Sequence, residues 1–296
     1  MIADLLIVPR LRSALWLGLA ALALLLLAAC AAGDPQATQP GGAALVPSLI
    51  PTLARPDALT TPAPAPADAC RAGRPGVELC RRSFRPTPDR PPVELLIARL
   101  DPALVRLRMA YAPDAPQLVS AWVRQTQPLL AVNAGFFDAQ YHSTALLISD
   151  GVAHGQSYEG FGGMLAVAPD GRVELRPLRD QPYDPAEPLG QALQSFPMLV
   201  FPGGQVAPIE DDGEYARRSA VALDRAGRLL VIVCASPSFT LRGLAEWLAA
   251  SDLAIDRALN LDGGASTGLY LDAGETSVQI DSFERVPAVL LVEPAP

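Results

Sequence analysis

Residues 258–267 read Ala-Leu-Asn-Leu-Asp-Gly-Gly-Ala-Ser-Thr, so a hydrophobic run ends in a carboxylate, a glycine pair and two hydroxyls. A strand that runs into such a turn is a common way to build a ligand site, because glycine lets backbone N–H groups approach a ligand closely. The turn can form an anion-binding nest, a metal ligand or a platform for a nucleophile. Taken alone it also occurs in turns without any function.

Three other segments share this design of an apolar strand joined to a polar turn. Residues 130–138 read Leu-Ala-Val-Asn-Ala-Gly-Phe-Phe-Asp, in which Gly135 permits a sharp turn after Asn133. Residues 194–200 read Gln-Ser-Phe-Pro-Met-Leu-Val, and Arg217 and Arg218 come shortly before the apolar run 220–223. Each segment alone is as consistent with an ordinary turn or a solvated strand end, so the combination carries the functional interpretation.

The hydrophobic pattern around these segments predicts many short strands and two helices. We expect helix 116–126, capped by Asp114, and helix 241–250, capped by Thr240. The expected strands are 93–100, 104–109, 129–132, 145–149, 164–167, 173–175, 198–201, 220–223, 229–234, 268–271, 277–280 and 288–292. Because the helices do not alternate with the strands, the pattern predicts an α+β domain with a mixed, mainly antiparallel central sheet and a few packed helices.

The N-terminal residues are typical of an exported lipoprotein. Arg10 and Arg12 precede an apolar run that ends in Leu-Ala-Ala-Cys at residues 27–30. This pattern predicts a signal peptide over 1–30 with lipidation of Cys30, and an ordinary secretory signal is the alternative. A Pro- and Ala-rich linker follows over 31–68, and a single domain over 69–296. We therefore expect a membrane-anchored protein on the cell surface or in the periplasm.

The remaining cysteines suggest one disulfide. Cys70 and Cys80 enclose a short loop, and export favours a bond between them. Cys234 lies in an apolar run and is expected to be a buried strand residue. No spacing of cysteine and histidine indicates a zinc site.

Length and charge narrow the function class. The chain has 296 residues, half of them apolar, which is enough for one domain with a real core. The formal net charge of −8 argues against nucleic-acid binding, which needs a basic surface.

In combination and order, the four segments resemble the phosphodiester glycosidase family. The resemblance rests on residues 133–137, on 195–197, on Arg218 before its strand, and on 260–266, and it spans about residues 93–292. Three positions depart from the family pattern, because Ala134, Phe196 and Ala265 stand where the family has glycine. Phe196 is the largest change.

The resemblance implies a hydrolase that cleaves the bond between a sugar anomeric carbon and a phosphodiester. It makes Arg218 the phosphate-binding fork, Asp262 the carboxylate at the anomeric carbon and Asn133 a ligand of a sugar hydroxyl or water. Asp138 and Glu159 are weaker candidates for a second carboxylate. The further substrate-binding candidates are Gly135, Phe136, Ser195, Arg217, Gly263, Gly264 and Ser266.

The implied partner is a sugar-phosphate-containing glycan of the envelope or extracellular material, and no cofactor is expected. A divalent ion at Asp262 stays an open alternative without a visible ligand set. Two non-enzymatic readings also stay open, namely a module of the same fold that binds anionic glycans and a structural envelope lipoprotein. The sequence leaves the sugar, the stereochemical outcome and the oligomeric state undefined.

Overall fold

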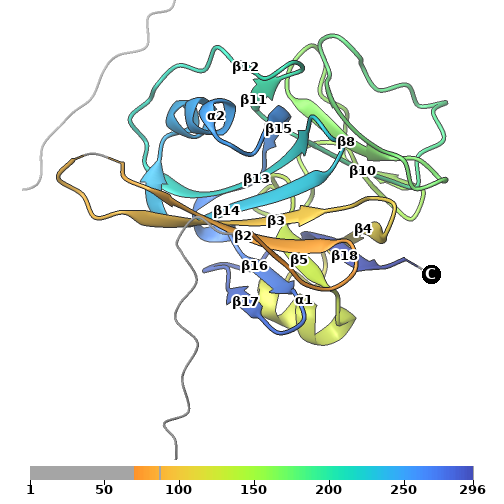
Figure 1. The fold of residues 1–296 in the computed structure, drawn as a ribbon. Helices are drawn as coiled ribbons and strands as arrows, with labels where there is room; N and C mark the ends of the chain where they lie inside the picture. Colours follow the sequence, from red (N-terminus) through yellow and green to blue (C-terminus); the bar gives the residue numbers. More distant parts are fainter. Residues whose placement is uncertain (1–69, 87, 296) are drawn as a thin grey trace, which may run out of the picture. The chain divides into compact units, whose positions relative to one another are not determined.

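The computed structural model describes residues 70–86 and 88–295, which form three antiparallel sheets and two α-helices (Figure 1). The predicted signal peptide, Cys30 and the linker lie outside these residues. Every strand pair in the three sheets is antiparallel. The expected mainly antiparallel strands are therefore confirmed, whereas one mixed central sheet is wrong.

The largest sheet has eight strands and contains the predicted strands 93–100 and 198–201 with their expected bounds, and the predicted strands 220–223 and 229–234 as parts of longer strands. In spatial order its strands are β1 (Cys70–Ala72), β2 (Val77–Phe84), β3 (Val93–Leu100), β14 (Leu229–Phe239), β13 (Ala216–Asp224), β15 (Ile255–Asn260), β11 (Met198–Phe201) and β12 (Gln205–Val206).

The other two sheets have five strands each. One consists of β7 (Val152–His154), β6 (Leu147–Ser149), β10 (Gln191–Ser195), β8 (Gly163–Val167) and β9 (Val173–Pro177), where β8 and β9 form the hairpin expected at Asp170-Gly171. The third consists of β17 (Ser277–Ile280), β16 (Leu269–Asp272), β5 (Leu130–Asn133), β18 (Ala288–Pro294) and β4 (Val105–Tyr111).

All three sheets contribute side chains to one hydrophobic core. Leu193 of the second sheet, Val221 of the first and Val132 of the third are fully buried members of it. Each helix covers the opposite face of a sheet. Helix α2 (Leu241–Ala250) packs on the eight-stranded sheet, and α1 (Val119–Thr126) packs on the third sheet (Figure 1). The layers therefore follow in the order α2, first sheet, third sheet and α1. The second sheet contributes to the core between the first and third sheets.

The N-terminus of α2 is capped by a neighbouring residue, whereas that of α1 is capped by a distant segment. Thr240 caps α2 as predicted, since its hydroxyl accepts the Gly243 N–H at 3.0 Å. The predicted cap of α1 is wrong, because this helix begins only at Val119 and Leu118 at its N-cap makes no side-chain bond. Its first N–H groups are instead bound by Ser282 Oγ and Asp281 Oδ1, from a segment about 160 residues away.

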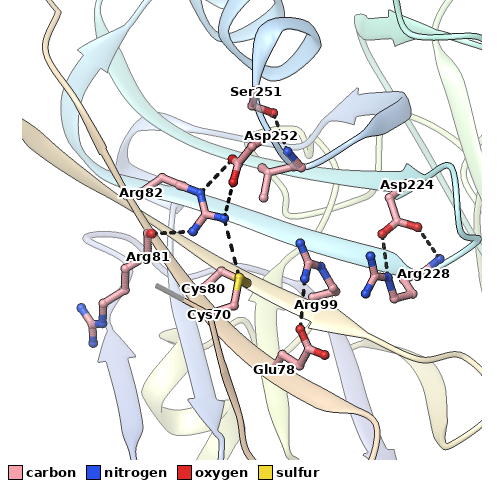
Figure 2. The surroundings of a disulfide bond; sticks show 11 residues. Cys70, Glu78, Cys80, Arg81, Arg82, Arg99, Asp224, Arg228, Ser251 and Asp252 are labelled. Carbon is pink, nitrogen blue, oxygen red and sulfur yellow. Dashed lines mark hydrogen bonds and ion pairs between the residues drawn. A yellow bond between two sulfur atoms is a disulfide. The ribbon is translucent and has the colours of Figure 1, made fainter. Parts of the chain in front are cut away.

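Cys70 and Cys80 form a disulfide between β1 and β2. Figure 2 shows the adjacent Arg82, whose guanidinium binds Asp252 through Nε at 2.9 Å and Nη2 at 2.8 Å. Among the described residues the third cysteine, Cys234, is free and buried, and burial raises the pKa of its thiol. Among the described residues, neither helix is long and apolar enough to cross a membrane.

Candidate functional site

The four polar turns meet where strands of all three sheets end. β13 and β15 are paired, and the backbone continues this pairing with a bond from Leu261 N to Ser219 O (2.9 Å). The next residue, Asp262, donates its N–H to Ala134 O in the first turn (3.1 Å). Asn260 binds the second turn, through Nδ2 to Phe196 O (2.9 Å). Residues far apart in sequence are thereby fixed around the fourth turn.

Asn133 is the buried link between these turns. Its side chain is fully buried, with Nδ2 donating to Asp262 O at 2.6 Å. Its Oδ1 accepts from the Ser219 hydroxyl (2.7 Å) and from Gly268 N (3.2 Å). This geometry differs from the expected contact with a sugar or water. It makes Asn133 a residue that holds Asp262 in place.

Removing this amide should destabilise the protein. In Asn133→Ala, the Ser219 hydroxyl, Gly268 N–H and Asp262 carbonyl would lose their partners inside the protein, so we expect a loss of about 2–3 kcal/mol in the free energy of unfolding. Urea denaturation measures this loss. The matched control Asn133→Asp keeps the acceptor oxygen but loses the donor and buries a charge, so it should not restore stability. A wild-type midpoint for Asn133→Ala would contradict the linking role.

Asp262 is the titratable group most strongly affected by the site. Burial raises its pKa to about 6, against the opposing effects of the Ser266 hydroxyl and of Gly263 N–H, which donates to Oδ1 at 2.9 Å. The nearby charge of Glu284 also raises the pKa. A carboxyl group that titrates close to neutral pH is suited to proton transfer and to nucleophilic attack.

Glu284 is the second carboxylate of the site, and the sequence analysis missed it. Ser266 Oγ donates to its Oε1 at 2.8 Å, and its own N–H is held by Ala265 O at 3.3 Å. Its loop carries no glycine-rich turn, so no local signal distinguishes it from other exposed acids. The predicted candidate Asp138 instead binds the N–H groups of Gln140 and His142 in its own turn.

The two arginines lie at an irregularity of β13, because the pairing with β14 shifts register between Ala216 and Arg218. Arg218 donates from Nε and Nη2 to the carbonyls of Phe239 (3.0 Å) and Glu214 (2.6 Å), and its Cδ lies 4.0 Å from the position of a Cβ on Gly263. The predicted phosphate-binding fork is thus largely occupied by backbone oxygens. Burial lowers the pKa of this guanidinium.

Arg217 makes fewer hydrogen bonds within the protein than Arg218. Arg217 is 6 % exposed and donates from Nη2 to Asp281 O (3.0 Å), while Nε and Nη1 are buried without a partner. The ring of Phe283 covers the guanidinium at 3.9 Å. A buried cation with unpaired N–H groups is costly unless an anion or water completes it. Arg217 is therefore the better candidate for an anionic group than Arg218.

Comparison with known proteins assigns the chain to a family. The model of the phosphodiester glycosidase family matches residues 126–293. The chain belongs to this family. A search of curated proteins finds no match.

Two solved structures share the fold. The zebrafish N-acetylglucosamine-1-phosphodiester alpha-N-acetylglucosaminidase catalytic domain, auto-inhibited by its pro-peptide, has a TM-score of 0.60 and 19% identity, covering 77% of this chain and 88% of that chain. A hypothetical protein from Synechocystis has a TM-score of 0.51 and 15% identity, covering 77% of this chain and 64% of that one. At these identities the likeness shows the fold alone.

Two glycines of the candidate site serve close packing. A Cβ on Gly263 would lie 2.9 Å from Arg217 O, and one on Gly135 would lie 3.0 Å from Gln194 O. Gly263 was a candidate for binding the substrate. Its N–H instead binds the carboxylate of Asp262 and is therefore not a free donor for a ligand. Gly264 begins the 3-10 turn Gly264–Ser266 with φ +59, a conformation that favours glycine.

A cluster of metal-ligating side chains and three surface hollows lie outside the four turns. Within the part of the chain that the structure describes, one group of three metal-ligating side chains is close together, Cys70, Glu78 and Cys80, and both of its sulfurs are in the disulfide. Three hollows of about 550, 420 and 420 Å³ are lined by residues outside the four turns. The candidate site therefore rests on the converging side chains and not on cavity size.

Proposed function

We propose that this protein hydrolyses the bond between a sugar anomeric carbon and a phosphodiester, in glycans of the envelope or extracellular material. The observation that carries the proposal is the pair Asp262 and Glu284 around Ser266. The first turn binds Asp262 directly, and the other two family turns bind the residues just before it. Family membership supports the reaction class. The chemistry of the site supports it independently, as the following steps explain.

The leaving group determines what such an enzyme must provide. When the C1–O bond breaks, its electron pair stays on a phosphate oxygen, which is a far weaker base than an alkoxide and needs less help from a general acid. The site must instead hold the phosphate and stabilise positive charge at the anomeric carbon. We assign the first task to Arg217 and the second to the ionised carboxylate of Asp262. Water then supplies the oxygen at C1 and loses a proton to a carboxylate.

The pH dependence should report Asp262. If its ionised form is required, kcat/KM should fall about tenfold for each pH unit below about 6. Glu284→Gln removes a like charge that raises the Asp262 pKa, so this limb should move to lower pH. Ser266→Ala removes a hydroxyl that Asp262 and Glu284 share and that lowers the Asp262 pKa, so the limb should move to higher pH. Initial rates measured across a range of pH for each variant would show these two shifts of the acidic limb, which are opposite in direction.

The control for charge alone is Glu275→Gln, which removes an exposed carboxylate in the turn between β16 and β17. It should leave the limb in place. If Glu284→Gln and Ser266→Ala moved the limb in the same direction, Asp262 would not be the group that titrates.

One feature favours the non-catalytic alternative. Phe196, which stands where the family has glycine, is 41 % exposed at the second turn, and a large side chain there could suit binding without turnover. The first probe is N-acetylglucosamine 1-(methyl phosphate), because the zebrafish relative is named for N-acetylglucosamine 1-phosphodiesters. Release of reducing sugar by the full chain supports the hydrolase. Saturable binding of the probe without release of sugar supports a non-catalytic protein of the same fold that binds anionic glycans.

We also propose that the protein is exported and anchored through Cys30. The disulfide supports an oxidising compartment. The lipid anchor itself stays a prediction from residues outside the described part of the chain.

A further inference from the structure

Four aromatic side chains gather beside the candidate site from three separate segments. Phe136 follows the first turn, Phe196 lies in the second, and Tyr158 and Phe161 belong to the loop before β8. The ring centroids of Phe136 and Phe196 are 4.7 Å apart, and those of Tyr158 and Phe161 are 4.6 Å apart. Phe196 also contacts Tyr158 at 5.8 Å and Phe161 at 6.0 Å. We call these four residues the aromatic platform.

The aromatic platform is exposed where apolar side chains would normally be buried. Phe161 is 51 % and Phe196 is 41 % exposed, while Phe136 and Tyr158 are half-buried. A contiguous exposed apolar surface in a soluble domain commonly marks a binding site. The loop that carries Phe161 is shaped for this position, because Gly162 adopts φ +74 and a Cβ there would lie 2.6 Å from Ser195 O.

Backbone contacts join the aromatic platform to the reacting groups. The carbonyl of Phe196 accepts from Asn260 Nδ2, two residues before Asp262. Phe136 is two residues after Ala134, whose carbonyl accepts from Asp262 N. The platform is therefore continuous with the candidate site.

Polar atoms without hydrogen-bond partners lie in the second and fourth turns. Ser195 Oγ, next to Phe196, and Asn260 Oδ1 are buried and have no hydrogen bond in the structure. Buried polar atoms are nearly always paired, so these two unpaired oxygens mark a polar boundary of the aromatic platform. The carboxylate of Glu159 is exposed next to Tyr158. The ligand should accordingly have one apolar face and a hydroxyl-bearing rim.

A pyranose ring has this form, because its ring C–H groups make an apolar face and its hydroxyls form the rim. We propose that the aromatic platform binds the pyranose ring of a sugar 1-phosphodiester by stacking, and that Phe196 and Phe161 determine which sugar is accepted. This inference rests on the proposed function. A lipid surface or a second copy of the chain would use the aromatic rings but would not need the unpaired oxygens.

The test separates sugar binding from hydrolysis in the full chain. The binding probe is methyl α-N-acetylglucosaminide, followed by NMR titration, and the kinetic probe is N-acetylglucosamine 1-(methyl phosphate). Phe161→Ala should raise the Kd of the first and the KM of the second about three- to tenfold, with kcat unchanged. Phe161→Tyr should keep the wild-type values, and Phe161→Leu, which keeps an apolar side chain without a ring, should behave like Phe161→Ala. The matched control is Leu104→Ala, at an exposed apolar residue between β3 and β4.

The outcomes decide the two proposals separately. If the wild type binds the methyl glycoside in a Phe161-dependent way but releases no sugar, the aromatic platform stands and the hydrolase proposal fails. If the wild type turns over the phosphodiester while Phe161→Ala or Phe161→Leu leaves Kd and KM unchanged, the platform is wrong and the hydrolase stands. If Phe161→Ala changes only the oligomeric state in sedimentation, the platform is a contact between copies and the inference is overturned.

Discussion

Asp262→Asn should lower kcat/KM by about 10²–10⁴-fold and at the same time stabilise the fold at neutral pH. The loss of activity follows because an amide can neither accept a proton nor carry the negative charge that faces the anomeric carbon. The amide oxygen can still accept from Gly263 N–H, which binds the carboxylate at 2.9 Å in the wild type. Binding of the substrate should therefore suffer less than turnover.

The stability gain follows from the raised pKa. Between the ordinary value of 3.8 and about 6, the folded state binds the proton of Asp262 more tightly than the unfolded chain does. The wild type consequently loses stability as the pH rises through this range, by about 2–3 kcal/mol in total. The asparagine variant does not titrate there and avoids this loss.

Urea unfolding at pH 4 and pH 8, together with initial rates on N-acetylglucosamine 1-(methyl phosphate), measures both effects. The difference in unfolding free energy between the variant and the wild type should grow in favour of the variant from pH 4 to pH 8. Glu275→Gln provides the control, as an exposed carboxylate outside the four turns. An asparagine variant with wild-type rates, or one whose relative stability does not change with pH, would contradict the role given to Asp262.

Arg217→Met should reduce kcat/KM by about 10²-fold, mainly through a higher KM. Two donors of a buried guanidinium have no partner, and hydrogen bonds to a charged group contribute about 1.5–3 kcal/mol each when a phosphate fills the site. Methionine replaces the unbranched part of the arginine side chain and carries no charge. Because it removes an unpaired buried cation, the variant should be at least as stable as the wild type.

The neighbouring arginine gives the matched comparison. Arg218→Met leaves the carbonyls of Phe239 and Glu214 without their donors, so it should lower the unfolding free energy by about 1–3 kcal/mol. Its effect on KM should be smaller than that of Arg217→Met. Methyl phosphate should raise the Tm of the wild type and of Arg218→Met, but not that of Arg217→Met. The reverse pattern would return the phosphate role to Arg218.

Local patterns in the sequence predict those parts of the fold that local physics determines. The strand at 277–280 and the helix at 241–250 have the predicted bounds, because alternating or helical periodicity and a threonine cap are encoded in adjacent residues. Helix α1 starts later than predicted because its capping groups, Ser282 and Asp281, come from a distant segment. The division into three sheets depends in the same way on long-range pairing.

In the candidate site, too, some features follow from the local sequence and others depend on long-range folding. The four turns could be recognised from glycines and polar residues at strand ends, and their backbone contacts do bring them together. The choice between Arg217 and Arg218 depends on which guanidinium is already bound by backbone carbonyls, and two adjacent arginines in a sequence do not indicate this. Glu284 was missed because only the folding of its loop against Ala265 brings it to Ser266.

The most direct measurement of the proposed reaction is the fate of oxygen from water. N-acetylglucosamine 1-(methyl phosphate) is incubated with the full chain in H₂¹⁸O, and the phosphate product is analysed by mass spectrometry. Cleavage between C1 and oxygen predicts methyl phosphate without ¹⁸O, together with free N-acetylglucosamine. Methyl phosphate or sugar phosphate that carries ¹⁸O would show attack at phosphorus and would contradict a carboxylate acting at the anomeric carbon.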